Sequence, residues 1–171
     1  PQSYKVATTP CLPKNGEGSA PLDHRLLTIF PSLYRTEAGA WYRLLLPWFM
    51  EGIDPSLYGG LPGREPGEAA WEAQADLEEA YLQGESLVYL SVDYYKYFDS
   101  FDVRFTVAML ERAGFPPQMV AFFQAVYEDL TRVIKIGRSL GTPFRPFNGI
   151  GQGDPFSLLR AILLVHWQFQ M

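Results

Sequence analysis

An apolar run that ends in an acidic residue constrains this chain more than any other feature of its sequence. The run Leu87–Val92 is rich in residues that favour β-strands, and Asp93 follows it directly. A short apolar run of this kind predicts a buried strand, which would hold the carboxylate of Asp93 on rigid scaffold at the edge of a sheet. Oxygen ligands suit a magnesium ion. We therefore predict a carboxylate placed for metal binding at the end of this strand.

The composition narrows the class of protein. With 171 residues, 47% of them hydrophobic, the chain can bury a sizeable core. Its net charge of -5 argues against a protein that wraps nucleic acid indiscriminately, although a local basic track remains compatible with it. The one cysteine, Cys11, suits a reducing compartment, so we expect the nucleus or the cytoplasm. The apolar runs are too short to span a bilayer, and no membrane partner is expected.

Hydrophobic periodicity, caps and turn residues predict an α+β fold. A loop dense in glycine and proline over 58–67 divides the chain into regions 1–67 and 68–171. A turn is predicted at Pro13–Gly16, and strand character at His24–Phe30. The predicted helices are Leu33–Phe49, Glu68–Gln83, Val103–Arg112, Pro117–Leu130 and a largely buried helix capped by Asp154, and the segments Arg132–Ile136 and Thr142–Asn148 predict a hairpin with a five-residue loop.

Several motifs, taken in their order along the chain, resemble those of reverse transcriptases, in particular the enzymes of non-LTR retrotransposons and group II introns. The motifs are Leu12-Pro13-Lys14, His24-Arg25-Leu26-Leu27 with Tyr34-Arg35, Tyr58-Gly59-Gly60-x-Pro62-Gly63-Arg64, Asp93-x-x-Lys96-x-Phe98-Asp99 and Gly149-x-x-Gln152-Gly153-x-Pro155-x-Ser157. The resemblance covers nearly the whole chain. It implies a right-hand polymerase with fingers over 1–67 and part of the palm over 68–171, built on an antiparallel sheet with helices packed on one side.

The resemblance also implies roles for individual residues. Asp93 would be the catalytic carboxylate that binds magnesium, with two ions expected in the complete enzyme, where such ions activate the primer hydroxyl and neutralise the leaving pyrophosphate. Lys14 and Arg25 would bind the triphosphate of the incoming deoxynucleotide, and Phe98 would exclude a ribose 2′-hydroxyl. Nucleotide-binding roles also fall to the pair Gln152 and Gly153. Arg64 would contact the nucleic acid, so the expected partners are an RNA or DNA template with its primer and deoxynucleoside triphosphates.

Each residue also has a plainer structural interpretation. Asp93 could cap a turn, Phe98 could be a core aromatic, and Asp99 or Asp102 could cap the helix that begins near Val103. Lys14 and Arg25 could be solvated surface cations, and Arg64 could simply complete its loop. The glycines near Gln152 could serve a common loop ahead of a helix, and His24 and His166 are expected to be structural.

Two departures from the family bear on activity. Leu158 follows Ser157 where the family usually has a proline, and the sequence contains no Asp-Asp pair of the kind that supplies the remaining metal ligands. Because the chain begins with Pro1 and ends without a helix stop signal, we expect a fragment. Because the Asp-Asp pair is absent, we expect that these residues do not polymerise DNA by themselves. Two other hypotheses are a catalytically inactive remnant that binds nucleic acid or a protein, and an unrelated α+β domain.

Overall fold

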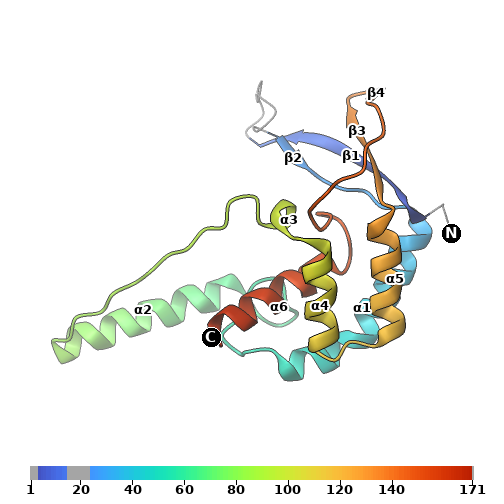
Figure 1. Ribbon diagram of the computed structural model, residues 1–171. Coiled ribbons are helices and arrows are strands. Elements are labelled where there is room, and N and C mark those ends of the chain that lie inside the picture. Colours follow the sequence, from blue (N-terminus) through green and yellow to red (C-terminus); the bar gives the residue numbers. More distant parts are fainter. Residues whose placement is uncertain (1–3, 15–23, 171) are drawn as a thin grey trace.

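A four-stranded sheet and a group of helices make up this α+β protein (Figure 1). The computed structural model describes residues 4–14 and 24–170. Asn15 and Gly16 of the turn predicted at Pro13–Gly16 therefore lie outside the described residues. The elements in chain order are β1 (Val6–Pro13), β2 (His24–Leu26), α1 (Ser32–Gly52), α2 (Pro66–Gln83), α3 (Tyr97–Ser100), α4 (Val103–Arg112), α5 (Pro117–Glu128), β3 (Thr131–Ile136), β4 (Ser139–Leu140) and α6 (Ser157–Phe169).

The sheet is mixed, which corrects the expectation of an antiparallel one. Its strand order is β2-β1-β3-β4, and the central pair, β1 and β3, runs parallel with Val6 opposite Thr131. The chain between these two strands contains α1 to α5 and is long enough for the crossover that a parallel pair requires. The sheet therefore joins strands from both regions predicted in the sequence, 1–67 and 68–171.

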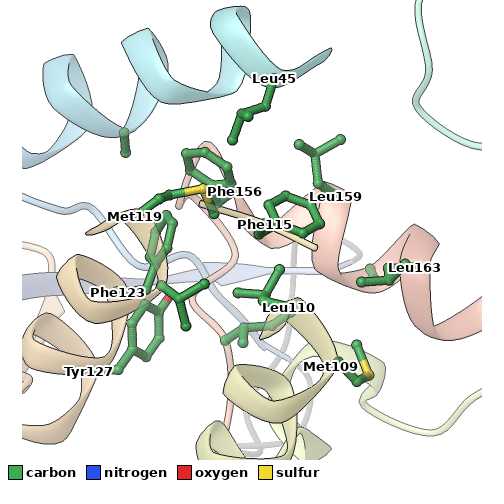
Figure 2. Close-up of a cluster of buried hydrophobic side chains, with 14 of the residues drawn as sticks. Leu45, Met109, Leu110, Phe115, Met119, Phe123, Tyr127, Phe156, Leu159 and Leu163 are labelled. Carbon is green, nitrogen blue, oxygen red and sulfur yellow. The ribbon is translucent and has the colours of Figure 1, made fainter. Parts of the chain in front are cut away.

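The core lies among the helices beside the sheet. Figure 2 shows apolar side chains from several helices converging. They are Leu45 of α1, Met109 and Leu110 of α4, Met119, Phe123 and Tyr127 of α5, and Leu159 and Leu163 of α6, joined by Phe115 and Phe156 from the adjoining turns. Close packing of large aromatic and aliphatic side chains supplies the main favourable term in folding. Helix α6 is buried along most of its length, as its apolar sequence predicts.

Local signals explain most of the helix ends. Asp102 caps α4, because its carboxylate accepts hydrogen bonds from the backbone N–H groups of Arg104 and Phe105. Helix α2 begins with a capping box between Glu65 and Glu68, and it ends at Gly84, which adopts a left-handed conformation with φ of 68°. The predicted hairpin is tighter than expected, since Ile136 pairs directly with Ser139 and leaves a two-residue connection.

The stretch predicted as a buried strand is exposed and unpaired, which corrects the sequence interpretation. Residues 85–94 form no regular element, and Val88 and Leu90 are 90% and 85% exposed. A strand is buried only when neighbouring strands pair with its backbone and another layer packs on its faces, and no described strand pairs with this segment. Figure 1 shows α2 and this segment extending together away from the other helices, and α2 buries none of its residues.

None of the described helices is both long enough and apolar enough to cross a membrane.

Candidate functional site

Four of the predicted site residues line one pocket. The pocket has a volume of about 490 Å³, and Lys14, Arg25, Asp93 and Gln152 all contribute to its wall. These residues come from four segments that are far apart in the sequence, so the tertiary fold brings them together. The pocket has cations on one part of its wall and a carboxylate on another, an arrangement suited to a ligand that carries both phosphates and a metal ion.

Lys14 and Arg25 are positioned by the antiparallel pair β1 and β2. Arg25 lies in β2 directly opposite Leu12 of β1, and Lys14 follows the last residue of β1. The pairing of these two strands brings the long side chains of Lys14 and Arg25 to the same edge of the sheet. The end of β1 thereby brings the ammonium of Lys14 to the pocket, and the edge strand β2 brings the guanidinium of Arg25.

The opposite side of the pocket is formed where the extended segment turns into α3. Asp93, Tyr94, Tyr95 and Lys96 line it, followed by Asp99 in α3. Lys96 adopts a left-handed backbone conformation with φ of 47°, and it is the one described residue other than glycine to do so. Such a conformation costs about 1–3 kcal/mol and is held by its surroundings, and strain of this kind clusters at functional sites.

Gln152 lies in a loop whose glycines pass so close to neighbouring protein atoms that little room is left for a side chain. A Cβ atom at Gly153 would lie 2.3 Å from the backbone oxygen of Thr28, and one at Gly151 would lie 2.5 Å from the ring of Phe30. A Cβ at Gly149 would lie 3.2 Å from the Cα of Asp99. The loop is therefore wedged between the chain after β2 and the chain at α3, where a side chain would collide at Gly151 and Gly153 and would be crowded and strained at Gly149, whose φ is 99°.

A buried polar network holds this loop from behind. The hydroxyl of Tyr127 donates a hydrogen bond of 2.5 Å to Asp154, and it accepts bonds from the backbone N–H of Gly151 at 3.1 Å and from Arg160 at 3.0 Å. Arg160 also forms an ion pair with Asp154, and both side chains are almost completely buried. The guanidinium stacks near the rings of Phe123 and Tyr127.

The protonation states in this network follow from its surroundings. Burial raises the pKa of the Tyr127 hydroxyl well above its ordinary value, so this group stays neutral and donates to the carboxylate. Burial by itself would lower the pKa of the Arg160 guanidinium, but its interactions with Tyr127 and Asp154 raise it. Arg160 is therefore a permanent cation that neutralises Asp154. The predicted cap at Asp154 lies one turn ahead of the helix: its carboxylate accepts a hydrogen bond of 3.0 Å from the backbone N–H of Phe156, and α6 itself begins at Ser157 with no side-chain cap.

The unusual Leu158 fits its surroundings at the start of α6. A Cβ atom at Gly60 would lie 2.8 Å from Leu158, so the side chain of Leu158 packs directly on the glycine-rich loop 58–67. Gly60 itself has a positive φ of 71°. Helix α6 therefore begins at Ser157 without a proline after it, and Leu158 makes an apolar contact with the glycine-rich loop from that position.

Three predicted site residues do not line the pocket. Phe98 is half-buried beside Tyr97, and its carbonyl accepts a hydrogen bond of 2.8 Å from Ile150, so it braces the glycine loop. Gly153 lies against Thr28. The guanidinium of Arg64 donates to the carbonyls of Asp54 at 2.7 Å and Leu57 at 3.0 Å, which matches the interpretation in which Arg64 completes its own loop.

The structure adds residues to the site that sequence reasoning did not select. Tyr94, Tyr95, Lys96 and Asp99 line the pocket, as does His24, which was expected to be structural. The motif Asp93-x-x-Lys96-x-Phe98-Asp99 contained two of them, and the left-handed backbone at Lys96 lies between Tyr95 and α3, where the extended segment ends. Sequence position alone carries no signal of that turn.

The carboxylates of the pocket suit a metal ion that arrives with its ligand. Asp93 and Asp99 both line the pocket, but the described residues contain no group of three or more side chains that could hold a metal ion by themselves. Magnesium is commonly bound by one or two carboxylates together with substrate phosphates and water. The donor set therefore fits magnesium bound together with a nucleotide phosphate better than a free ion.

Comparison with known proteins gives one informative similarity. The chain is 29% identical over 157 residues to the "Transposon TX1 uncharacterized 149 kDa protein" of Xenopus laevis. The aligned region covers 92% of this chain and 12% of that relative, so the chain corresponds to a small part of a much longer protein. No protein-family model matches the chain.

Proposed function

We propose that the chain is the nucleotide-binding part of an RNA-directed DNA polymerase derived from a mobile element. The observation that carries this proposal is the single pocket in which Lys14, Arg25, Asp93 and Gln152 meet. Two supports are independent of it: the order of the reverse-transcriptase-like motifs along the chain, and the similarity to a transposon-encoded protein.

Each group in the pocket has a role in this proposal. Lys14 and Arg25 bind the triphosphate, and Lys96 contributes a third cation from the segment that carries Asp93. Asp93 holds the magnesium ion that accompanies the nucleotide, with Asp99 as its neighbour, and such an ion supplies charge neutralisation at the phosphates and activation of the attacking hydroxyl. Gln152, held by the glycine loop, offers both a donor and an acceptor to the base or the sugar.

The 171 residues contain no adjacent pair of aspartates, so we expect binding without polymerisation. Two-metal phosphoryl transfer requires carboxylates that converge on both ions, and the described residues offer too few for both. Template-dependent incorporation of deoxynucleotides by the purified chain would contradict this expectation.

A titration of the full chain with deoxynucleoside triphosphates tests the proposal. We expect dTTP to bind in the presence of magnesium and to bind at least about tenfold more weakly without it, a difference of about 1.4 kcal/mol. The change Asp93→Asn should remove the magnesium dependence, because it removes a charged oxygen ligand. The double change Lys14→Ala with Arg25→Ala should weaken triphosphate binding in both conditions.

A matched control separates the pocket from general charge effects. Arg43 and Arg112 are exposed and do not line the pocket, so Arg43→Ala with Arg112→Ala removes the same charge elsewhere and should leave nucleotide binding unchanged. Equal losses in both double variants would mean that the pocket is not the binding site. Binding of UTP as tight as that of dUTP would show that the pocket does not select the deoxyribose.

The alternative function is a non-catalytic module that binds nucleic acid. The observation that favours it is a stretch of basic residues beside the pocket. Retained nucleic-acid binding in a chain that shows no magnesium-dependent nucleotide binding would support this alternative over the polymerase.

A further inference from the structure

In one stretch of this acidic chain, every charged residue is Lys or Arg. Residues 130–153 contain four Lys and Arg residues and no Asp or Glu, whereas the whole chain carries a net charge of -5. The stretch includes β3, β4 and the segment that returns beside β3, and we call residues 131–148 the basic hairpin. In Figure 1 it lies at the opposite end of the molecule from the C-terminal end of α4. A concentration of one charge on one element favours a partner of the opposite charge.

The cations of the basic hairpin are available to such a partner. Lys135 and Arg138 are exposed, and neither forms an ion pair with any described residue. Arg145 is 70% exposed and lies 3.5 Å from Asp129, at the long end of an ion-pair distance. Ion pairs of this kind at the surface contribute little to stability, so Arg145 could leave Asp129 for a polyanion with little loss of stability.

Apolar side chains accompany these cations. Phe147 is 98% exposed, and Ile136 and Leu140 are 68% and 66% exposed. An aromatic ring that projects into solvent next to cations is typical of proteins that bind single-stranded nucleic acid, in which bases stack on rings while cations follow the backbone. Charge alone would also suit a protein partner with an acidic surface, but a single-stranded nucleic acid supplies both the phosphates for the cations and the bases for the ring of Phe147.

The base of the basic hairpin adjoins the nucleotide pocket. Arg132 is buried opposite Phe144, and its Nε and Nη2 atoms have no hydrogen-bond partner among the described residues. Burial lowers the pKa of this guanidinium, and the charge of Asp99, a pocket residue, opposes that lowering. The hairpin then continues into the loop that carries Gln152. A strand lying along the hairpin would therefore lead toward the pocket.

We propose that the basic hairpin binds single-stranded RNA or DNA, with Lys135 and Arg138 on the phosphates and Phe147 stacked on a base, and that it guides the strand toward the pocket. The last step rests on the proposed function, because it needs the pocket to hold the incoming nucleotide. The binding surface itself lies outside the pocket.

Fluorescence anisotropy with labelled 16-nucleotide DNA and RNA of the same sequence, measured on the full chain from 50 to 200 mM salt, tests this inference. We expect Lys135→Ala with Arg138→Ala to weaken binding at least about tenfold at low salt. Each lost phosphate contact makes the negative slope of log affinity against log salt shallower by about 0.7 for single strands, so the double variant should have a slope shallower by about 1.4. Phe147→Ala should weaken binding at least about fivefold with the slope unchanged.

The pair Arg43→Ala with Arg112→Ala is the control, because it removes two exposed cations outside the hairpin. An equal loss of affinity in this control would overturn the inference, as would a wild-type chain that binds neither oligonucleotide at 50 mM salt. Binding of an acidic peptide in preference to both oligonucleotides would overturn it as well. Weaker binding of RNA than DNA, or the reverse, identifies which strand the surface takes.

Magnesium-dependent binding of dTTP keeps the two proposals distinguishable. If the hairpin variants bind dTTP normally but bind oligonucleotides as well as the wild type, the inference fails and the proposed function stands. If dTTP does not bind while the hairpin variants lose oligonucleotide binding, the surface is real and the polymerase proposal fails.

Discussion

At the scale of single residues, the ion pair between Asp154 and Arg160 links the helical core to the candidate pocket. Both side chains are buried, and through Tyr127 they reach the backbone N–H of Gly151 in the loop that carries Gln152. A buried ion pair adds little stability compared with a well-packed apolar pair, but the loss of one partner leaves an uncompensated charge in the interior. The pair therefore fixes the geometry of the loop more than it stabilises the protein.

The change Arg160→Met should destabilise the protein by about 3–5 kcal/mol, because the carboxylate of Asp154 would remain buried without a countercharge. The double change Arg160→Met with Asp154→Asn should recover part of that loss, since the charge is then removed. Urea unfolding at pH 7 measures both variants. Arg104→Met serves as control, because Arg104 is 93% exposed and its removal should change the free energy of unfolding by less than about 0.5 kcal/mol. A loss as small for Arg160→Met would contradict the burial of this pair.

At the scale of elements, the loop 149–153 depends on glycines for a reason internal to the protein. The loop passes so close to Thr28, Phe30 and Asp99 that little room is left for a side chain at three of its positions. The sequence interpretation assigned the closeness of Gly153 to a bound nucleotide, whereas the structure shows that the backbone after β2 already requires it. The same wedge holds Gln152 at the pocket, so packing and binding depend on one feature.

The change Gly153→Ala should both destabilise the protein and displace Gln152, because the added methyl group would meet the backbone oxygen of Thr28, which cannot move as a side chain does. We expect a loss of about 1–3 kcal/mol in the free energy of unfolding and weaker nucleotide binding. Gly39→Ala is the matched control: Gly39 lies within α1 with open space around it, so alanine there should stabilise the protein by about 0.5–1 kcal/mol. If both alanine variants have the same stability, the close approach at Gly153 is not rigid.

At the scale of the whole molecule, the chain divides into a packed body and a projecting acidic arm, which we define as residues 65–95. The arm contains eight of the 19 acidic residues and no Lys or Arg, so the rest of the chain holds 14 cations against 11 acids. Helix α2 buries none of its residues, and the extended segment after it exposes large apolar side chains such as Val88 and Leu90. The arm meets the body at its C-terminal end, where Asp93, Tyr94 and Tyr95 line the pocket and Tyr94 donates a hydrogen bond of 2.5 Å to Gln168.

Hydrogen exchange followed by mass spectrometry should show two levels of protection. We expect amides of the arm to exchange much faster than those of α5 and α6, because an 18-residue helix without tertiary burial is marginally stable in water. The extended segment should exchange fastest, since no described strand accepts its hydrogen bonds. Protection of α2 equal to that of α6 would contradict the exposed arm.

Much of the local structure could be predicted from the sequence. The α4 boundaries, the cap at Asp102 and the end of α2 at Gly84 follow from signals within a few residues, and such signals act wherever the segment lies in the fold. The order of the motifs also selected Lys14, Arg25, Asp93 and Gln152, which the structure brings to one pocket. What these residues bind remains a proposal.

Other features were decided only by the tertiary structure. The run Leu87–Val92 has the composition of a buried strand, yet burial requires a partner, and none of the described strands lies beside it. Asp154 has the sequence of a helix cap, yet it pairs with Arg160 because the fold buries both. The sequence determines what each segment can form from its own residues. Only contacts between distant segments decide which faces are covered and which charges meet, because burial and pairing are properties of neighbours in space.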